Sequence, residues 1–328
     1  MFAKKNLIAV AALATLAVSA QAQSSVTLYG NVDAGLTYSK VKQAGNSDTT
    51  TGVTSSILTE SFFGLKGQED LGGGLKAVFK LEAPIAVDTG AASTTNFFGK
   101  NAYVGVAGAF GAVNVGRQES LFKQEAIAFN PLGASKLSPT ALAFGLQNDS
   151  WSNTVGYVSP NLGGLTISAQ HSFKEATKPA GADSYNGGAT AVAANYTVGA
   201  LGLSAVYGDV RSTTNAAVTD RQRAWLLGAS YDFSVVKAFA QYGQVKSEAA
   251  DETAKTWQLG AIVPVTEAGS VHAAFGQVKV DGDKAKQFSL AYHHALSKRT
   301  SAYAGGAYVK ADDAFKATVL AVGVRHAF

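Results

Sequence analysis

The sequence of 328 residues contains no cysteine, only six prolines and, after residue 24, no long apolar run. Without cysteine, no disulfide can hold the fold together and no thiol can serve as a nucleophile. A membrane-spanning helix needs about 20 consecutive apolar residues, so a bundle of such helices is excluded. Charged residues are also sparse, at 15%, against roughly 25% in soluble domains. The formal net charge of +4 is too small to indicate a nucleic-acid partner.

The first 22 residues have the three parts of a secretory signal peptide. A short basic start is followed by an apolar run, Leu7–Val18, which is too short to span a bilayer. Ala20–Ala22 then has the small-x-small form of a signal-peptidase site. We therefore expect a signal peptide at 1–22 and an exported mature chain at 23–328. The alternative is an uncleaved anchor helix.

From residue 25 onward, apolar and polar residues alternate in segments of about ten residues. The pattern is clearest in segments 26–37, 225–233, 257–263, 287–296 and 320–328. Because successive side chains of a strand point to opposite faces, each segment has one apolar face and one polar or small face. A long series of such segments is typical of a transmembrane β-barrel.

Turn-forming residues separate these segments by short and long connections in alternation. Short connections lie at 69–74, 109–111, 159–164, 198–200, 233–235, 266–269 and 297–300, and long polar ones at 39–58, 87–98, 120–150, 174–188, 211–220, 247–253, 281–284 and 311–315. Seven short and eight long connections join about sixteen strands, an even number as in bacterial barrels. Short connections then face the periplasm and long ones the exterior, with both chain ends on the periplasmic side.

A soluble sandwich or solenoid is the alternative, and it would turn the apolar face inward. The remaining face of these segments is rich in glycine, serine, glutamine and charge, which makes a poor core. Tyrosine and phenylalanine gather near the segment ends, where the aromatic girdle of a membrane barrel belongs. The chain also ends on an aromatic residue, Phe328. These features favour the membrane barrel.

Five segments carry a resemblance to a known family. They are SVTLYGNVDAGL (25–36), GLKGQEDLGGGLKAVFKLE (64–82), NAYVGVAGAFGAVNVGRQ (101–118), VGYVSPNLGGLTISAQHSF (155–173) and VGVRHAF (322–328). In this order they resemble the trimeric general porins of Gram-negative bacteria, and especially the beta-proteobacterial subgroup. The resemblance implies an all-β fold, namely a 16-stranded antiparallel transmembrane β-barrel with the third external loop folded into the lumen. It also implies a homotrimer in outer-membrane lipid that lets small hydrophilic solutes and ions pass.

The expected function is therefore passive diffusion through a water-filled pore. A substrate-specific channel for sugars or organic acids is the alternative, and it needs a ladder of aromatic or charged residues along one wall. Only Tyr29, Phe62, Phe239 and Tyr308 have a plausible inward parity. Catalysis is disfavoured because the chain has no Gly-x-Ser-x-Gly elbow and no metal-spaced histidine pair. We expect no catalytic residue, no metal site and no cofactor.

The longest interruption of the alternation, residues 120–150, corresponds to the inserted loop of the resembled family. Its length is anomalous for a plain connector, which independently indicates a functional element. It is mildly apolar, so we expect it to pack against other residues; an exposed tip is the alternative.

In the resembled family, a basic ladder on the wall faces acids on the inserted loop, and that ladder is depleted here. Phe62 stands at a position that is usually arginine, either lining the lumen or packing under the loop. The residues that we expect at the pore constriction are Lys100, Lys66, Phe62 and Asp33 on the wall, together with Glu119, Glu125 and Asp149. Loss of arginine positions favours a weaker anion preference than in relatives, whereas the positive net charge favours anions.

Two further residues are expected to act on the outer side of the barrel. Arg117 has outward parity, and an isolated arginine facing hydrocarbon costs about 2–4 kcal/mol at the bilayer midplane. Relatives in the resembled family place a trimer-stabilising arginine at this position, so we expect Arg117 at the trimer interface. We expect Phe328 to be a membrane anchor, and the resemblance implies that the barrel-assembly machinery recognises it.

Overall fold

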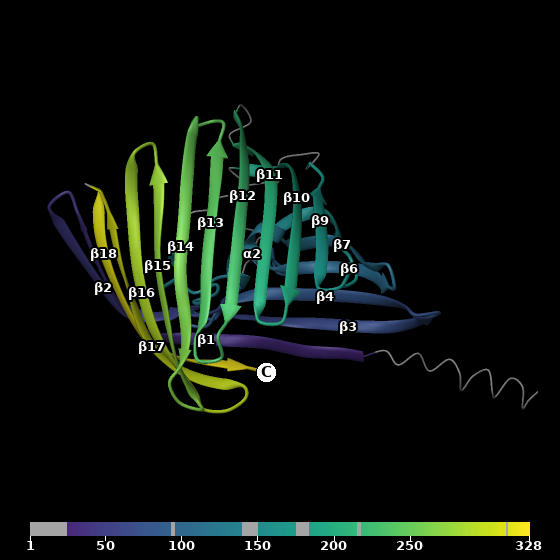
Figure 1. The fold of residues 1–328 in the computed structure, drawn as a ribbon, viewed down its shortest axis with the longest axis horizontal. Helices are drawn as coiled ribbons and strands as arrows, with labels where there is room; N and C mark the ends of the chain where they lie inside the picture. The colour runs from purple at the N-terminus through teal and green to yellow at the C-terminus, as the bar shows by residue number, and fades with distance from the viewer. Residues whose placement is uncertain (1–24, 93–95, 140–149, 175–183, 215–217, 313) are drawn as a thin grey trace, which may run out of the picture.

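A computed structural model describes residues 25–92, 96–139, 150–174, 184–214, 218–312 and 314–328. These residues form eighteen β-strands and the α-helix α2 (Figure 1). The elements are β1 (Ser25–Gln43), β2 (Asn46–Ser55), β3 (Phe62–Gly72), β4 (Leu75–Ala86), β5 (Ala91–Ala92), β6 (Asn101–Gly108), β7 (Gly111–Glu119), α2 (Leu121–Ala128), β8 (Ser150–Val158), β9 (Leu165–Ser172), β10 (Ser184–Val198), β11 (Leu201–Thr214), β12 (Val218–Asp232), β13 (Lys237–Ser247), β14 (Glu252–Pro264), β15 (Gly269–Val280), β16 (Asp283–Ala295), β17 (Thr300–Ala311) and β18 (Phe315–Ala327). The expected signal peptide, residues 1–22, lies outside the described residues.

Sixteen of the eighteen strands form a closed antiparallel barrel, and β2 and β5 are accessory strands. Each barrel strand pairs with the next one along the chain, and β18 closes the ring by pairing with β1 from Asn31↔Ala327 to Gln43↔Phe315. Closure leaves the wall of the sixteen described barrel strands without a free edge between β18 and β1, which is what a strand protein requires in lipid. The prediction of a 16-stranded antiparallel barrel is confirmed.

The first long connection contains more strand than the sequence pattern indicates. Residues 39–58 were expected to be a polar connection, but β1 continues to Gln43 and β2 folds back onto it through Asn46. Ala44 and Gly45 form the turn with positive φ angles of 47° and 83°, as two-residue hairpin turns require. Threonine and serine dominate both faces of β2, so no apolar alternation reveals it as a strand.

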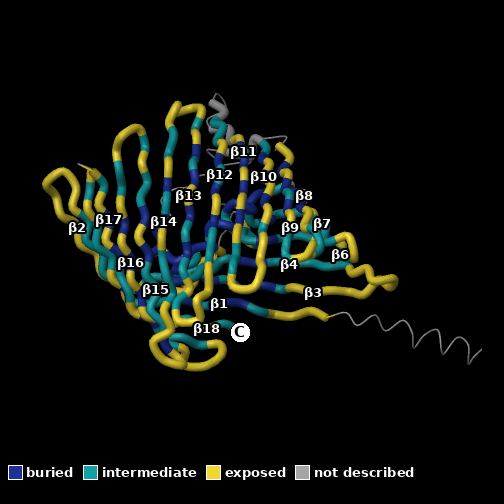
Figure 2. Tube along the Cα trace, viewed as in Figure 1, coloured by how far each residue is buried: buried dark blue, intermediate teal, exposed yellow. Residues whose placement is uncertain are grey.

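The two faces of the barrel wall differ sharply in exposure. Leu227 and Leu259 point outward and are 51% and 57% exposed, whereas Leu226 and Gln258 point inward and are each 1% exposed. Figure 2 shows buried and exposed residues alternating along strands β10 to β16. The outward leucines therefore offer an apolar surface to lipid. Among the described residues, no helix is long and apolar enough to cross a membrane.

The last residue of the chain completes the closure of the barrel. The backbone N–H groups of Gly30 and Phe328 each donate to the other's carbonyl oxygen at 3.1 Å. The Phe328 ring covers Gly30, where a Cβ atom would lie 2.5 Å from the ring Cζ. Only glycine therefore lets the terminal ring lie flat on β1 at this point.

Candidate functional site

The segment after β7 lies against the inner face of the barrel wall. Gln241 of β13 donates from Nε2 to the carbonyl oxygen of Ala126 on α2 at 2.9 Å, and Gln287 of β16 donates to that of Leu137 at 2.8 Å. Both glutamines are buried and share the inward parity of their strands. The described part of the expected loop, residues 120–139, therefore occupies the lumen, while residues 140–149 lie outside the described residues.

Glu125 attaches the helix α2 to the wall. Its carboxylate accepts hydrogen bonds from Asn195 Nδ2 of β10 at 2.8 Å and from Ser204 Oγ of β11 at 2.7 Å. The residue is 8% exposed. Glu125 is thus inside the lumen, as expected, but both carboxylate oxygens are directed at the wall rather than at the open pore.

Glycines on the inner wall make room for this loop. The Cβ position at Gly228 would lie 2.7 Å from the Phe129 ring, and that at Gly276 would lie 2.8 Å from Pro139. Any larger residue at either position would push the loop off the wall, so the wall has no side chains where the loop is bulkiest.

Four charged side chains from three parts of the chain meet at the start of α2, and we call them the charge cluster. They are Glu60 before β3, Lys100 before β6, Glu119 at the end of β7 and Lys123 on α2. Lys100 Nζ lies 2.8 Å from a Glu60 oxygen and 2.7 Å from a Glu119 oxygen. Lys123 Nζ lies 3.1 Å from the same Glu119 oxygen and 3.8 Å from Glu60. Two cations and two carboxylates leave the cluster formally neutral.

Lys100 is the centre of the charge cluster. Burial lowers its pKa, but Glu119 and Glu60 outweigh that effect and raise the pKa to about 12. Lys100 therefore stays charged at any physiological pH. Its Nζ also lies 5.6 Å from the centroid of the Phe62 ring, which in turn contacts Tyr29 edge-on at 5.7 Å.

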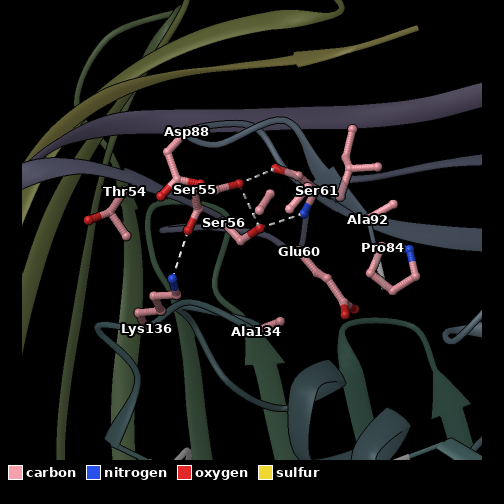
Figure 3. A pocket seen from close by; sticks show the side chains of 13 residues that line it. Thr54, Ser55, Ser56, Glu60, Ser61, Pro84, Asp88, Ala92, Ala134 and Lys136 are labelled. Atoms are coloured by element: carbon pink, nitrogen blue, oxygen red, sulfur yellow. Dashed lines mark hydrogen bonds between the residues drawn. The ribbon is translucent and has the colours of Figure 1, made fainter. Parts of the chain in front are cut away.

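Two hollows flank the charge cluster. The external hollow has a volume of about 660 Å³ and includes Glu60 and Lys136, whose Nζ donates to the Ser55 carbonyl oxygen at 2.7 Å (Figure 3). The inner hollow, of about 340 Å³, is lined by Glu119 and Tyr103 among others. Because one carboxylate of the cluster lines each hollow, the cluster lies between them.

Asp33 has the expected inward parity but is completely buried. It accepts hydrogen bonds from the backbone N–H groups of Leu58 and Thr59 at 2.7 and 2.8 Å and from the Tyr303 hydroxyl at 2.6 Å. Asp33 therefore holds the segment between β2 and β3 in place, and that segment carries Glu60 to the charge cluster.

Lys66 is exposed on the inner wall below the charge cluster. Its Nζ lies 4.6 Å from the centroid of the Tyr29 ring. Together with Lys80 and Tyr103 it lines a further hollow of about 580 Å³. Neighbouring Glu82 is 2% exposed and binds Tyr29, Asn101 and Lys80.

Sequence reasoning missed some of these residues. Glu60 follows a polar connection and shows no motif, so nothing singled it out. His272 belongs to no metal-spaced pair and was not singled out either, yet its Nδ1 lies 2.6 Å from the Pro131 carbonyl oxygen of the loop. Tyr308 was expected to point inward and points outward, because it has the opposite parity to buried Tyr303 and is 45% exposed. Asp149 lies outside the described residues.

Arg117 lies on the outer side of the barrel, in an irregular pairing of β7 with β8. Its Nε donates to the Gly99 carbonyl oxygen at 2.6 Å and its Nη1 to Ser152 Oγ at 2.8 Å. Val115, two residues earlier on the same face, is 53% exposed. The guanidinium is therefore held near the surface of the β6–β8 wall.

Comparison with known proteins agrees with this geometry. The family model described as "Gram-negative porin" matches residues 9–314. The chain is 36% identical to outer membrane porin protein 32 of Delftia acidovorans, over 98% of this chain and 93% of that protein. It is 31% identical to an outer membrane porin protein of Bordetella pertussis, over 99% of this chain and all of that protein. The solved anion-selective porin from Comamonas acidovorans superimposes with a TM-score of 0.80 at 29% identity, covering 93% of this chain and all of that one.

Proposed function

The chain belongs to the Gram-negative porin family and is a diffusion channel of the outer membrane, and on that premise we propose that the charge cluster forms its pore constriction. The single observation that carries the proposal is the position of the cluster between two hollows, beside a loop that is bound to the inner wall. A porin of this kind lets small hydrophilic solutes and ions pass and catalyses no reaction.

The charge arrangement supports a weak preference for anions. The charge cluster is neutral, so it attracts neither sign strongly. Below it, Lys66 is exposed and the Lys80 side chain is 30% exposed, whereas Glu82 is buried with its oxygens bound to neighbours. The charge that faces permeating ions there is therefore positive. The similar Comamonas acidovorans protein is described as anion-selective.

A planar bilayer tests this proposal. In a tenfold KCl gradient, we expect ohmic channels with a reversal potential of the sign for anions, well below the limit of about 59 mV for a perfectly selective pore. Folded, heat-modifiable protein that gives no conductance would overturn the open pore. A reversal potential of the sign for cations would overturn the selectivity.

We also propose that the chain is a homotrimer and that Arg117 lies at the subunit interface. An outward arginine on an apolar wall is costly unless protein or water covers it. Arg117→Ala should convert the trimer to monomers in light scattering from detergent solution. Arg223→Ala is the matched control, because Arg223 is an outward arginine on β12, remote from β6–β8. An Arg117→Ala protein that remains trimeric would contradict the assignment.

The exposed terminal ring supports a role in assembly. Phe328 is 41% exposed at the periplasmic end of β18, so the barrel-assembly machinery can reach it before insertion, and lipid can contact it afterwards. Removal of Phe328 should slow insertion in cells more than refolding in detergent. Equal slowing in both assays would assign Phe328 to folding alone.

A further inference from the structure

A hollow of about 580 Å³ lies on the inner wall below the charge cluster, where β1, β3, β4 and β6 run side by side. The strand pairing places Lys66 opposite both Thr27 and Lys80, and Lys80 opposite Tyr103. Residues directly opposite each other in a sheet have their side chains on the same face. All four line this space together with Tyr29. We call it the lower hollow.

The lower hollow carries one positive charge that no carboxylate offsets. Lys80 Nζ lies 3.0 Å from Glu82 Oε1, so these two charges cancel. Both oxygens of Glu82 already accept hydrogen bonds, from Tyr29 and Asn101. In the part of the chain that the structure describes, no carboxylate forms an ion pair with Lys66, which is exposed on the inner wall. The open charge of the lower hollow therefore fits a monoanion.

Two tyrosine rings provide the aromatic part of the lower hollow. The Tyr29 hydroxyl donates to Glu82 Oε1 at 2.6 Å, which fixes the ring against the wall. Gly64 makes room for this ring, because a Cβ atom there would lie 3.1 Å from Tyr29 Cε1. The Tyr29 side chain thus reaches from β1 across β3 to β4, toward Tyr103 on β6. A ring held in this way offers a rigid surface on which another ring can pack.

Lys66 brings the open charge to the rings. Its Nζ lies 4.6 Å from the centroid of the Tyr29 ring, close enough for the ring face to attract the ammonium group. A solute with a carboxylate beside an aromatic ring can therefore contact Lys66 and a tyrosine at the same time. A carboxylate without a ring meets only the charge, and a neutral ring meets only the tyrosines.

We propose that the lower hollow binds aromatic monocarboxylates on their way through the pore, with the carboxylate at Lys66 and the ring against the tyrosines. The inference rests on the proposed anion-preferring pore and names a class of solute for it. A volume of about 580 Å³ is in the range of small-molecule sites. Binding should be weak, because a solute that passes through a pore must also leave it.

Planar bilayers in KCl test the inference with three probes, namely benzoate, acetate and benzamide. A bound solute obstructs the path of the ions, so the measured quantity is the probe concentration that gives half of the maximal reduction in KCl conductance. We expect benzoate to reach this point at a concentration about fivefold lower than acetate, because only benzoate adds ring contacts. Benzamide has the ring without the charge and should leave the conductance unchanged.

Single substitutions locate the site. Lys66→Gln should raise the half-maximal benzoate concentration about fivefold, and Tyr103→Leu should bring benzoate closer to acetate. The matched control is Lys237→Gln on β13. Lys237 Nζ also lies near a ring, 5.3 Å from the Phe239 centroid, but it does not line the lower hollow. Its variant should respond to benzoate as the parent protein does.

Saturation-transfer NMR of benzoate with the folded proteins in detergent gives a second measure that does not depend on conductance. Equal action of benzoate and acetate would reduce the lower hollow to a site for any anion and contradict the inference. An unchanged benzoate response in Lys66→Gln, or an equal loss in Lys237→Gln, would contradict it as well.

Failure of this inference can be told apart from failure of the proposed function. Ohmic, anion-preferring channels that do not respond to benzoate would contradict the inference alone. Missing channels or a preference for cations would contradict the proposed function itself. In that case the NMR signal still decides whether the lower hollow binds benzoate.

Discussion

Replacing Lys100 by glutamine should make the pore prefer cations. In the structure, Lys100 Nζ lies 2.7 Å from Glu119 and 2.8 Å from Glu60. Its removal leaves Lys123 alone against two carboxylates, so the charge cluster changes from neutral to a net charge of −1. Every ion that passes the constriction then meets one uncompensated negative charge.

The size of the effect follows from Coulomb's law. An ion passing at about 5 Å from the uncompensated charge gains or loses about 0.8 kcal/mol in water. Screening over a Debye length of about 10 Å in 0.1 M salt lowers this to about 0.5 kcal/mol. Because the sign is opposite for cations and anions, the ratio of cation to anion permeability should rise about fivefold.

Reversal potentials in a KCl gradient measure this ratio, and the charge cluster offers matched variants. Lys123→Gln removes the same charge from the other cation and should shift the potential in the same direction. Glu60→Gln removes a carboxylate and should shift it toward anions. Lys100→Arg keeps the charge and should leave the reversal potential unchanged. Two results would refute the assignment of the constriction. One is an unchanged reversal potential in folded Lys100→Gln protein. The other is a shift of the reversal potential with the same sign in Lys100→Gln and Glu60→Gln.

Two further predictions concern the loop and the closure of the barrel. Glu125→Ala removes two hydrogen bonds to a charged group, each worth about 1.5–3 kcal/mol. The attachment of α2 to the wall should therefore weaken and the open-channel current noise should rise, with Glu125→Gln intermediate. Steady currents through the Glu125→Ala channel would contradict this role of Glu125. Gly30→Ala places a Cβ atom 2.5 Å from the Phe328 ring and 2.6 Å from the Phe62 carbonyl oxygen, and overpacking of this kind costs about 1–3 kcal/mol. The barrel should therefore lose heat resistance on gels at a lower temperature, whereas Gly52→Ala, which meets nothing within 4 Å, should behave as the parent does.

The barrel could be predicted from the sequence because lipid imposes a strict pattern on it. Outward residues such as Leu227 and Leu259 must be apolar, whereas Gln258, which precedes Leu259 and points inward, can be polar. The period of two and the seven short connections follow directly from that constraint. The pattern fails for β2, where threonine and serine occupy both faces, so that a real strand reads as a polar connection.

The charge cluster was less predictable because its members come from three parts of the chain, namely Glu60, Lys100 and the stretch 119–123. The resemblance pointed to Lys100 and Glu119 as constriction residues, but it carried no information on which side chains meet. Asp33 illustrates the limit. Its inward parity was correct, yet backbone groups of Leu58 and Thr59 enclose it completely. The burial of Asp33 depends on the path of the chain between β2 and β3, and this path produces no periodic pattern in the sequence.

The inward glycines have a second role that composition alone did not reveal. In the sequence they argued against a soluble core, because glycine offers no side chain to bury. In the structure, Gly228 and Gly276 are where Phe129 and Pro139 rest on the wall. The loop gains burial for its apolar residues only because the wall there is flat. Wall positions that lack a side chain therefore set the position of the loop, and with it the width of the pore. They matter as much as the wall positions that carry a charge.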